Sequence, residues 1–356
     1  MAIFPGRSQR RTKVNIVTAT SESVGAGQVG GNTPWQASLR AAIRHPAELI
    51  RRLSLANSLS PAAAEASRDF PTFVPLEYLA RIEPGNLDDP LLRQVLPVSE
   101  ELAAPAGFSD DPLAESDAAV TGGMLQKYAH RVLLVTTGAC AVHCRYCFRR
   151  HFPYEDVPGA ISHWAEALEQ IAGDESIREV ILSGGDPMML RDERLSELVE
   201  RLETIEHLRR LRIHTRLPIM IPSRVTDEFV AMLRSSRLTP LMVVHVNHAA
   251  EIDDDVELAL ARLVEAGIPV LNQAVLLRGV NDDVDALEAL SERLLACRVM
   301  PYYLHQLDRV TGAAHFEVPL ERGRELIEQL RARLPGYAVP RYVAEIPGEL
   351  NKTVLA

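Results

Sequence analysis

The sequence predicts an α/β protein built on a partial (β/α)6 TIM-like barrel, with a small helical N-terminal region and a C-terminal helix followed by a tail. Short apolar runs alternate with amphipathic helical segments through residues 116–316. This alternation builds a parallel sheet through right-handed crossovers, and six units are too few for a closed eight-stranded barrel. A chain of 356 residues, 47% of them hydrophobic, can bury this core and an appendage.

Residues 1–34 are rich in Gly, Ser, Thr and charge and are expected to form a flexible leader. From Trp35 the apolar residues recur at helical spacing, and Pro61 opens a further helix, so residues 35–115 are predicted to form the helical N-terminal region. Residues 317–356 are assigned to the C-terminal helix and tail.

The barrel is expected to contain strands at 132–135, 180–182, 211–214, 241–246, 270–275 and 299–304. Helices are expected at 161–172, 195–205, 227–234, 256–265 and 284–295. Functional side chains should follow the carboxyl ends of the strands, because loops at that end of such barrels hold the active site.

A cysteine loop follows the first predicted strand, with Cys140, Cys144 and Cys147 separated by three and then two residues. Three thiolates can hold three irons of a cubane iron–sulfur cluster and leave the fourth iron open for a ligand. Zinc is the alternative, with His143 as a further ligand. However, zinc sites usually take four tetrahedral ligands, and Cys297 is the only other cysteine.

The Cys-x3-Cys-x2-Cys spacing with Tyr146 before the last cysteine resembles the signature of radical S-adenosylmethionine enzymes. The resemblance implies a [4Fe–4S] cluster whose open iron chelates S-adenosylmethionine and generates a 5′-deoxyadenosyl radical. It also implies that Ser183, Gly184, Gly185 and Asp186, which follow the second strand, contact the cofactor's methionine part. A Gly-Gly-Asp-Pro run alone is also an ordinary turn.

Lysine is scarce: of 38 basic residues only Lys13, Lys127 and Lys352 are lysines. In a chain that otherwise uses arginine, each lysine is a candidate for Schiff-base chemistry, which a guanidinium cannot perform. Lys352 lies four residues from the end of the sequence, where a frayed tail is the alternative.

An ordered series of motifs from Gly122 to Thr353 resembles the lysine 2,3-aminomutases. The resemblance implies that Lys352 binds pyridoxal 5′-phosphate covalently. It further implies cofactor phosphate contacts from Lys127, Tyr128 and Arg131, and S-adenosylmethionine contacts from His245 and Gln273.

Substrate residues follow from the same resemblance. Arg149 matches the position that receives the substrate carboxylate, while Asp308 and Glu345 match two acidic positions that receive a distant ammonium group. An arginine at one end and carboxylates at the other suit an amino acid with a cationic side chain such as lysine. The implied reaction moves the amino group from C2 to C3 and gives β-lysine.

Residues 301–316 and Glu345 resemble the enzymes that make (R)-β-lysine for elongation factor P, and the sequence stops soon after Lys352, without the cysteine-bearing extension of larger aminomutases. The resemblance implies a functional link to elongation factor P and its lysine ligase, with a reductant such as flavodoxin or ferredoxin. A free-lysine aminomutase of catabolism or secondary metabolism is the alternative pathway. A non-catalytic iron–sulfur redox sensor is the alternative of another class.

Charge and composition exclude further classes. The formal charge of −10 argues against a nucleic-acid partner, which would need a concentrated basic face. Neither a membrane-spanning apolar run of roughly 20 residues nor a secretory h-region is present in the sequence. A cytoplasmic location is expected, because the cluster thiols must stay reduced.

Overall fold

The computed structural model describes residues 33–55, 61–103, 105–154 and 161–356. Their centre is one nine-stranded sheet whose spatial order, β1 to β9, is the order of the chain. The strands are β1 (Met124–Tyr128), β2 (Arg131–Thr137), β3 (Glu179–Gly184), β4 (Arg210–Thr215), β5 (Thr239–His245), β6 (Val270–Val275), β7 (Met300–His305), β8 (Arg341–Ala344) and β9 (Thr353–Val354). Strands β2 to β8 are parallel, and β1 and β9 pair antiparallel at the two edges.

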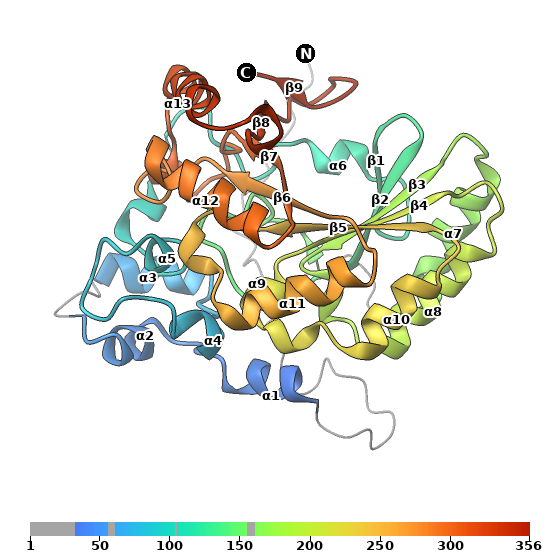
Figure 1. Ribbon diagram of the computed structural model, residues 1–356, viewed down its shortest axis with the longest axis horizontal. Helices are drawn as coiled ribbons and strands as arrows, with labels where there is room; N and C mark the ends of the chain where they lie inside the picture. Colours follow the sequence, from blue (N-terminus) through green and yellow to red (C-terminus); the bar gives the residue numbers. More distant parts are fainter. Residues whose placement is uncertain (1–32, 56–60, 104, 155–160) are drawn as a thin grey trace, which may run out of the picture.

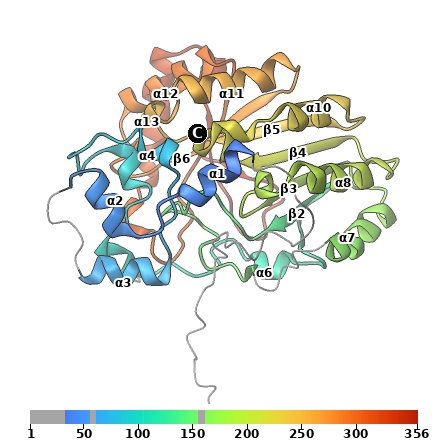
Figure 2. The same cartoon turned by 90° about the horizontal axis from the view of Figure 1, so that it is seen from below.

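Six long helices follow the parallel strands and cover the outside of the curved sheet (Figures 1 and 2). They are α7 (Ile161–Gly173), α8 (Asp192–Glu203), α10 (Asp227–Ser235), α11 (Asp254–Glu265), α12 (Val284–Ala296) and α13 (Leu320–Arg333). Side-chain oxygens of Thr226, Asp253 and Asp283 cap the N-termini of α10, α11 and α12 by accepting backbone N–H groups.

Alternation along each strand explains how the sheet separates its core from its inner face. In β4, Leu211 and Ile213 are buried beneath the helices, whereas Arg212 and His214 point into a cavity on the other face. Period-two alternation of this kind sends successive side chains to opposite faces. The inner face is therefore free to carry polar groups.

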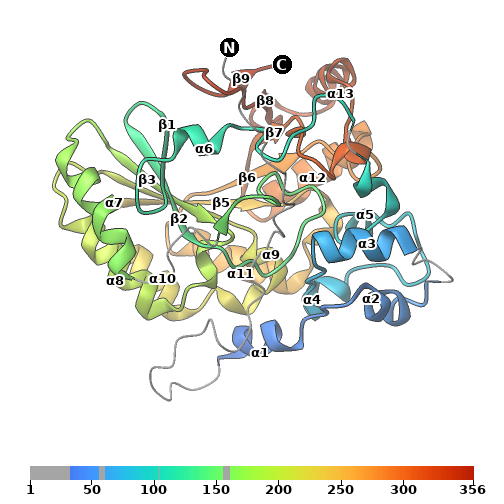
Figure 3. The same cartoon turned by 180° about the vertical axis from the view of Figure 1, so that it is seen from behind.

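The N-terminal helices are α1 (Pro34–Ala41), α2 (Pro46–Arg52), α3 (Pro61–Asp69), α4 (Leu76–Leu79) and α5 (Pro90–Arg93), with the 3-10 turn η1 (Ser99–Leu102). Helices α2 to α5 form a group at one side of the molecule, away from α7 and α8, and α1 lies beneath its middle (Figures 1 and 3). Glu101 of η1 joins this group to the cysteine loop, because its buried carboxylate accepts hydrogen bonds from Arg145 and Arg150.

A four-residue helix, α6 (Glu115–Ala118), lies between β1 and the β8–β9 end of the sheet in two opposite views (Figures 1 and 3). Its first residue, Glu115, contacts Lys127 of β1, and Lys127 contacts Glu345, which follows β8. The helix therefore bridges the open side of the sheet, between its two edges.

The predicted partial, open barrel is confirmed, with differences at its ends. The six predicted strands correspond to β2–β7, the five predicted helices to α7, α8, α10, α11 and α12, and the expected C-terminal helix to α13. Strand β8 adds a seventh parallel strand, and β1 and β9 add antiparallel edges that the sequence patterns did not indicate. The predicted leader falls almost wholly outside the described residues, as does Lys13. No helix among the described residues is long and apolar enough to cross a membrane.

Candidate active site

A cavity of about 540 Å³ opens inside the curved sheet, at the carboxyl ends of the strands. All sixteen site residues predicted from the sequence line it, including the three cysteines of the loop and Lys352. Seven lysine and arginine side chains line the same wall, against four carboxylates. A basic cavity in a protein of formal charge −10 suits anionic ligands such as a phosphate or a carboxylate.

The cysteine loop is fixed to the N-terminal helices. The backbone N–H of His143 donates to Phe73 (3.1 Å), and that of Arg145 donates to Gln94 (2.9 Å). Arg216, at the end of β4, donates to the Cys144 sulfur at 2.7 Å. A cationic donor of this kind suits a sulfur that carries negative charge.

The arrangement of the thiols favours a cluster over a single zinc ion. In the described part of the chain, no three His, Cys, Asp or Glu side chains gather closely enough to hold one metal ion. The thiols nevertheless face one cavity, as a cubane requires, because each thiolate binds a different iron. The imidazole of His143 bonds the Pro71 carbonyl and packs against Phe70 and Phe73.

The glycine turn after β3 packs directly on the cysteine loop. A Cβ at position 185 would lie 2.3 Å from the Ala139 carbonyl oxygen, so only glycine fits there. The N–H groups of Gly185 and Asp186 donate to the Thr137 and Ala139 carbonyls. The turn therefore fixes the distance between the loop and the sheet.

Asp186 is held by internal partners. Its buried carboxylate accepts hydrogen bonds from the Thr215 hydroxyl and from the backbone N–H groups of Met188 and Arg216. Burial raises its pKa to about 6, against the effect of these donors. In this arrangement the carboxylate joins the turn after β3 to the end of β4, and its predicted contact with S-adenosylmethionine stays a prediction.

His245 and Gln273 are register partners at the ends of β5 and β6, and both line the cavity. The His245 ring lies 5.7 Å, centroid to centroid, from the ring of Tyr146 in the cysteine loop. Burial lowers the pKa of His245 to about 3, so its imidazole is neutral at physiological pH. His245 thus borders the cysteine loop, and Gln273 lies beside it in the sheet.

Five charged side chains of alternating sign form a continuous chain of ion pairs across the cavity wall. Lys352 bonds Glu345, and Glu345 bonds Lys127 at 2.8 Å. Lys127 lies 3.2 Å from Glu115, whose two oxygens accept from Arg149 at 2.7 and 2.8 Å. The network links the predicted cofactor lysine to the predicted carboxylate-binding arginine.

The two predicted ammonium-binding carboxylates differ in charge state. Burial opposes ionisation of Glu345, but the ammonium groups of Lys352 and Lys127 hold its pKa at about 2. Burial and the charge of Glu345 raise the pKa of Asp308 to about 7. Asp308 is therefore the group whose ionisation a bound cation would change.

The remaining predicted site residues also line the cavity and contact one another or Arg149. The Arg131 guanidinium stacks over the Tyr128 ring at 4.5 Å, and burial first, then Glu345, raises the pKa of Tyr128. The Ser183 hydroxyl accepts from Arg149 at 2.9 Å, and the Gly184 carbonyl accepts from the same side chain at 3.4 Å.

The same cavity is lined by further residues to which the sequence analysis gave no site role, namely Glu115, Arg212, His214, Tyr302, Tyr303, His305 and Arg341. Tyr302, Tyr303 and His305 lie in the stretch 301–316, whose resemblance gave none of them a role of its own. Glu115 lies in a connection rich in proline and aspartate and carries no motif. Strand alternation is the signal that could have found Arg212 and His214, because their neighbours Leu211 and Ile213 are apolar.

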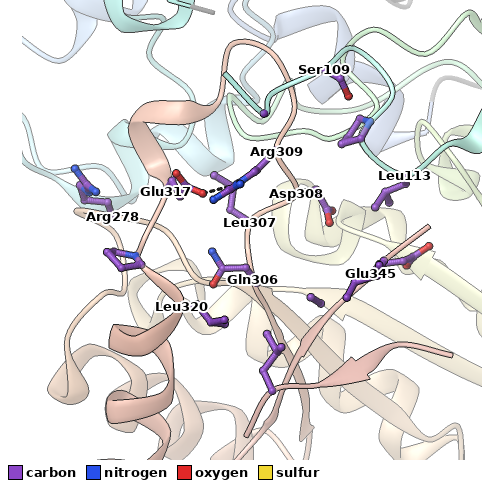
Figure 4. A pocket seen from close by; sticks show the side chains of 16 residues that line it. Ser109, Leu113, Arg278, Gln306, Leu307, Asp308, Arg309, Glu317, Leu320 and Glu345 are labelled. Carbon is purple, nitrogen blue, oxygen red and sulfur yellow. Dashed lines mark hydrogen bonds and ion pairs between the residues drawn. The ribbon is translucent and has the colours of Figure 1, made fainter. Parts of the chain in front are cut away.

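A second cavity of about 750 Å³ adjoins the first (Figure 4). Asp308 and Glu345 line both cavities and therefore form part of the wall between them. On the outer side, Arg309 pairs with Glu317 at 2.7 Å, as Figure 4 shows. The acidic end of the first cavity thus borders the second cavity.

The donor groups fit the implied cofactors. Three thiols suit an iron–sulfur cluster, a half-buried amine at Lys352 suits an aldehyde cofactor, and basic side chains near Lys127 suit its phosphate. Arg149 and Asp308 on the same wall suit the two charged ends of an amino acid.

Comparison with known proteins agrees with this chemistry. Residues 134–290 match the Radical SAM superfamily. L-lysine 2,3-aminomutase of Haemophilus influenzae is 45% identical over 90% of this chain and 95% of its own length. L-lysine 2,3-aminomutase of Escherichia coli is 46% identical over 91% of this chain and 96% of its own length.

Among solved structures, Streptococcus suis SuiB bound to S-adenosylmethionine is similar over 62% of this chain and 51% of its own, with a TM-score of 0.48 and 15% identity. The family is shown by the two aminomutases, whose identity extends over nearly their whole length. The chain therefore belongs to the L-lysine 2,3-aminomutase family of radical SAM isomerases.

Proposed function

We propose that this protein converts L-lysine to (R)-β-lysine and depends on pyridoxal 5′-phosphate bound at Lys352. One observation carries the proposal: a single cavity gathers the cysteine loop, Lys352, Arg149 and the carboxylates of Asp308 and Glu345. Family membership implies a [4Fe–4S] cluster, S-adenosylmethionine and pyridoxal 5′-phosphate as cofactors. When bound, they supply a hydrogen-abstracting radical and an aldehyde that holds the migrating amino group.

The chain's own residues would bind and orient the cluster and the two organic cofactors. Cys140, Cys144 and Cys147 would hold the cluster, with Ser183, Gly184, Gly185, Asp186, His245 and Gln273 around its ligand. Lys127, Tyr128 and Arg131 would hold the cofactor phosphate. These roles are supported by the common cavity and by the chemistry of each donor.

Substrate selection follows from charge. Arg149 presents a guanidinium edge suited to a carboxylate, while Asp308 and Glu345 suit a side-chain ammonium group. Arg149 is already paired with Glu115 on the edge formed by Nε and Nη2. Nη1 donates to the Ser183 hydroxyl and the Gly184 carbonyl. A substrate carboxylate would therefore take the second N–H of Nη2 and replace one of these two acceptors of Nη1. A glutamate side chain would place its charge against two carboxylates, so the site favours lysine.

The pathway we propose is modification of elongation factor P, with a separate ligase consuming the β-lysine. The support is the resemblance of residues 301–316 and of Glu345 to that subfamily. A reduced cluster and a small flavodoxin or ferredoxin as electron donor fit a cytoplasmic location. A free-lysine aminomutase would perform the same reaction for a different consumer.

The reaction is tested by anaerobic reconstitution with iron, sulfide and pyridoxal 5′-phosphate, followed by S-adenosylmethionine, a reductant and L-lysine. We expect β-lysine by mass spectrometry, and none from the Lys352→Ala variant with an intact cluster. Deoxyadenosine without β-lysine would overturn the substrate assignment. Full activity of Lys352→Ala would overturn the cofactor assignment.

The pathway is tested separately, in cells that lack the gene. We expect elongation factor P from these cells to lack the mass of the β-lysyl group, and to regain this mass when the gene is restored. Unchanged elongation factor P, with β-lysine lost from the free amino-acid pool, would favour the free-lysine alternative.

A further inference from the structure

Two histidines outside the predicted site face the cavity, and one ring nitrogen of each lacks a hydrogen-bond partner among the described residues. His214 lies near the end of β4 and His305 at the end of β7, and both line the cavity. The Nε2 atom of each is buried and has no partner in the described part of the chain. Buried polar groups without partners are rare and costly in folded proteins. Each imidazole therefore points to a ligand that completes its hydrogen bonding.

Both imidazoles lie close to Lys352. His305 is in register with Val343 of β8, and Val343 is in register with Val354 of β9, two residues after Lys352. The sheet thus brings the end of β7 beside the cofactor lysine. His214 comes from β4, which β5 and β6 separate from β7 in the sheet, so the two rings enter the cavity from different strands.

Their surroundings keep both rings uncharged. Burial lowers the pKa of each well below its usual value, and the Lys352 ammonium adds to this effect at both rings. The rings of Tyr303 and His305 also make an edge contact, with their centroids 5.5 Å apart. A neutral imidazole offers one N–H donor and one acceptor, which suits an uncharged or weakly basic polar atom.

We propose that His214 and His305 bind the ring of the aldehyde cofactor held at Lys352, each with a neutral imidazole nitrogen on a polar ring atom. A pyridoxal-type ring carries two such atoms, the phenolic oxygen and the pyridine nitrogen. The inference rests on the proposed function, because it requires the cofactor at Lys352. It adds two binding residues: His214, which no motif indicated, and His305, to which the resemblance of residues 301–316 gave no role of its own.

The proposal has a chemical consequence. A carboxylate partner, as in many pyridoxal phosphate enzymes, keeps the pyridine nitrogen protonated and makes the ring a strong electron sink. A neutral imidazole does not force this protonation. The ring would then be suited to holding an amino group during radical chemistry rather than to stabilising a carbanion.

The test uses the full chain with its cluster reconstituted. Pyridoxal 5′-phosphate is titrated into wild type, His214→Leu and His305→Leu, and the bound cofactor is followed by its absorption maximum. We expect each Leu variant to bind about tenfold more weakly, with a shifted maximum, as the loss of one ligand hydrogen bond predicts. His305→Gln, which keeps a neutral N–H donor, should recover most of the affinity.

His315→Leu is the matched control, because His315 is also largely shielded and has an unpartnered ring nitrogen but lies outside the lining of this cavity. Its cofactor affinity and absorption maximum should equal those of wild type. Iron content and S-adenosylmethionine affinity should stay unchanged in all variants.

Other outcomes overturn the proposal. If both Leu variants keep the wild-type cofactor affinity and absorption maximum, the histidines do not bind the cofactor. The same conclusion would follow if the variants lost only S-adenosylmethionine binding, or if His315→Leu lost as much cofactor affinity as they do. A different result would overturn the proposed function itself: after borohydride reduction of the wild-type protein, mass spectrometry would find no pyridoxyl group on Lys352. In that case the inference falls with it.

Discussion

At the scale of single residues, the burial of the Asp308 carboxyl group costs stability. Its folded-state pKa of about 7 lies above the model-peptide value of 3.8. The folded state therefore binds the proton more tightly than the unfolded chain, and stability falls as pH rises from about 4 to about 7. Above pH 7 the full cost of the buried charge is present.

We expect Asp308→Asn to stabilise the protein at pH 8 by on the order of 1–3 kcal/mol, because the neutral amide removes a buried, repelled charge. At pH 4, where Asp308 is protonated, the gain should vanish. Urea unfolding of the full chain at both pH values measures this. The same variant should bind lysine more weakly, and equal destabilisation at both pH values would contradict the assignment.

Glu115 is the residue that most directly controls Arg149. Its carboxylate pairs with the guanidinium through two hydrogen bonds and also contacts Lys127. Glu115→Gln removes the carboxylate that pairs with Arg149, whereas Lys127 keeps Glu345, so the Arg149 guanidinium is held less firmly in its orientation. We expect KM for lysine to rise about tenfold, the loss typical of one charge-assisted hydrogen bond, with iron content unchanged.

Asp117→Asn is the control for Glu115→Gln, since Asp117 is exposed on the same short helix. Steady-state kinetics of both variants separate the two effects. A fall in kcat at unchanged KM would place Glu115 in another role.

Single residues also show where sequence reasoning stops. The cysteines, Arg149 and Lys352 could be assigned because each belongs to a motif with a chemical purpose. Glu115 could not, because its partner Arg149 lies 34 positions away and only the folded chain brings them together. Strand alternation predicts that His214 points to the inner face of the sheet, but it does not predict what the imidazole binds there.

At the scale of elements, the contact between η1 and the cysteine loop joins two regions of the fold. Glu101 is buried and bonds both Arg145 and Arg150. Removing one partner of a buried ion pair leaves charge without compensation, at a cost of about 3–5 kcal/mol. The N-terminal helices thus support the loop that would hold the cluster.

We expect Glu101→Ala to lower the free energy of unfolding by about 3–5 kcal/mol and to reduce iron retention after reconstitution. Glu100→Ala, at an exposed neighbouring position, should behave like wild type. Urea denaturation and iron analysis give the two readouts. Normal iron retention in Glu101→Ala would show that the loop holds its shape without η1.

Strand β9 holds Lys352 at the edge of the sheet. The backbone N–H of Leu355 donates to the Tyr342 carbonyl at 2.8 Å. Proline lacks this N–H, so Leu355→Pro should loosen β9 and abolish pyridoxyl labelling of Lys352, while iron content stays normal. Leu355→Ala keeps the N–H and should retain labelling, as mass spectrometry after borohydride reduction would report. Labelling at the wild-type level in Leu355→Pro would contradict this role of β9.

The elements that were predicted and those that were not differ in length and pattern. Strands β2–β7 carry apolar runs flanked by amphipathic helices, so periodicity predicts them. Strand β9 has only two residues, and β8 only four, so no period can be read from either. Their pairing depends on distant partners, which local sequence does not encode.

At the scale of the whole molecule, charge is unevenly distributed. The chain is acidic overall, yet the cavity that is lined by the predicted site residues carries an excess of lysine and arginine. Anionic cofactors should therefore bind with a salt dependence that neutral analogues lack.

We expect the affinity for pyridoxal 5′-phosphate to fall about threefold between low and moderate salt, because screening weakens its attraction to the basic wall. Pyridoxal, which lacks the phosphate, should change little under the same conditions. Titration of each ligand in a salt series gives the slopes. Equal slopes for both ligands would show that the phosphate does not use these cations.

The scarcity of lysine also makes the protein accessible to chemical footprinting. Only three lysines are present, and two of them, Lys127 and Lys352, flank Glu345 inside the cavity. An amine-selective acylating reagent will therefore modify few positions, and two of these report directly on the cavity. In a crude cell extract, protection of the peptides that contain Lys127 and Lys352 would measure cofactor loading of the native enzyme without purification.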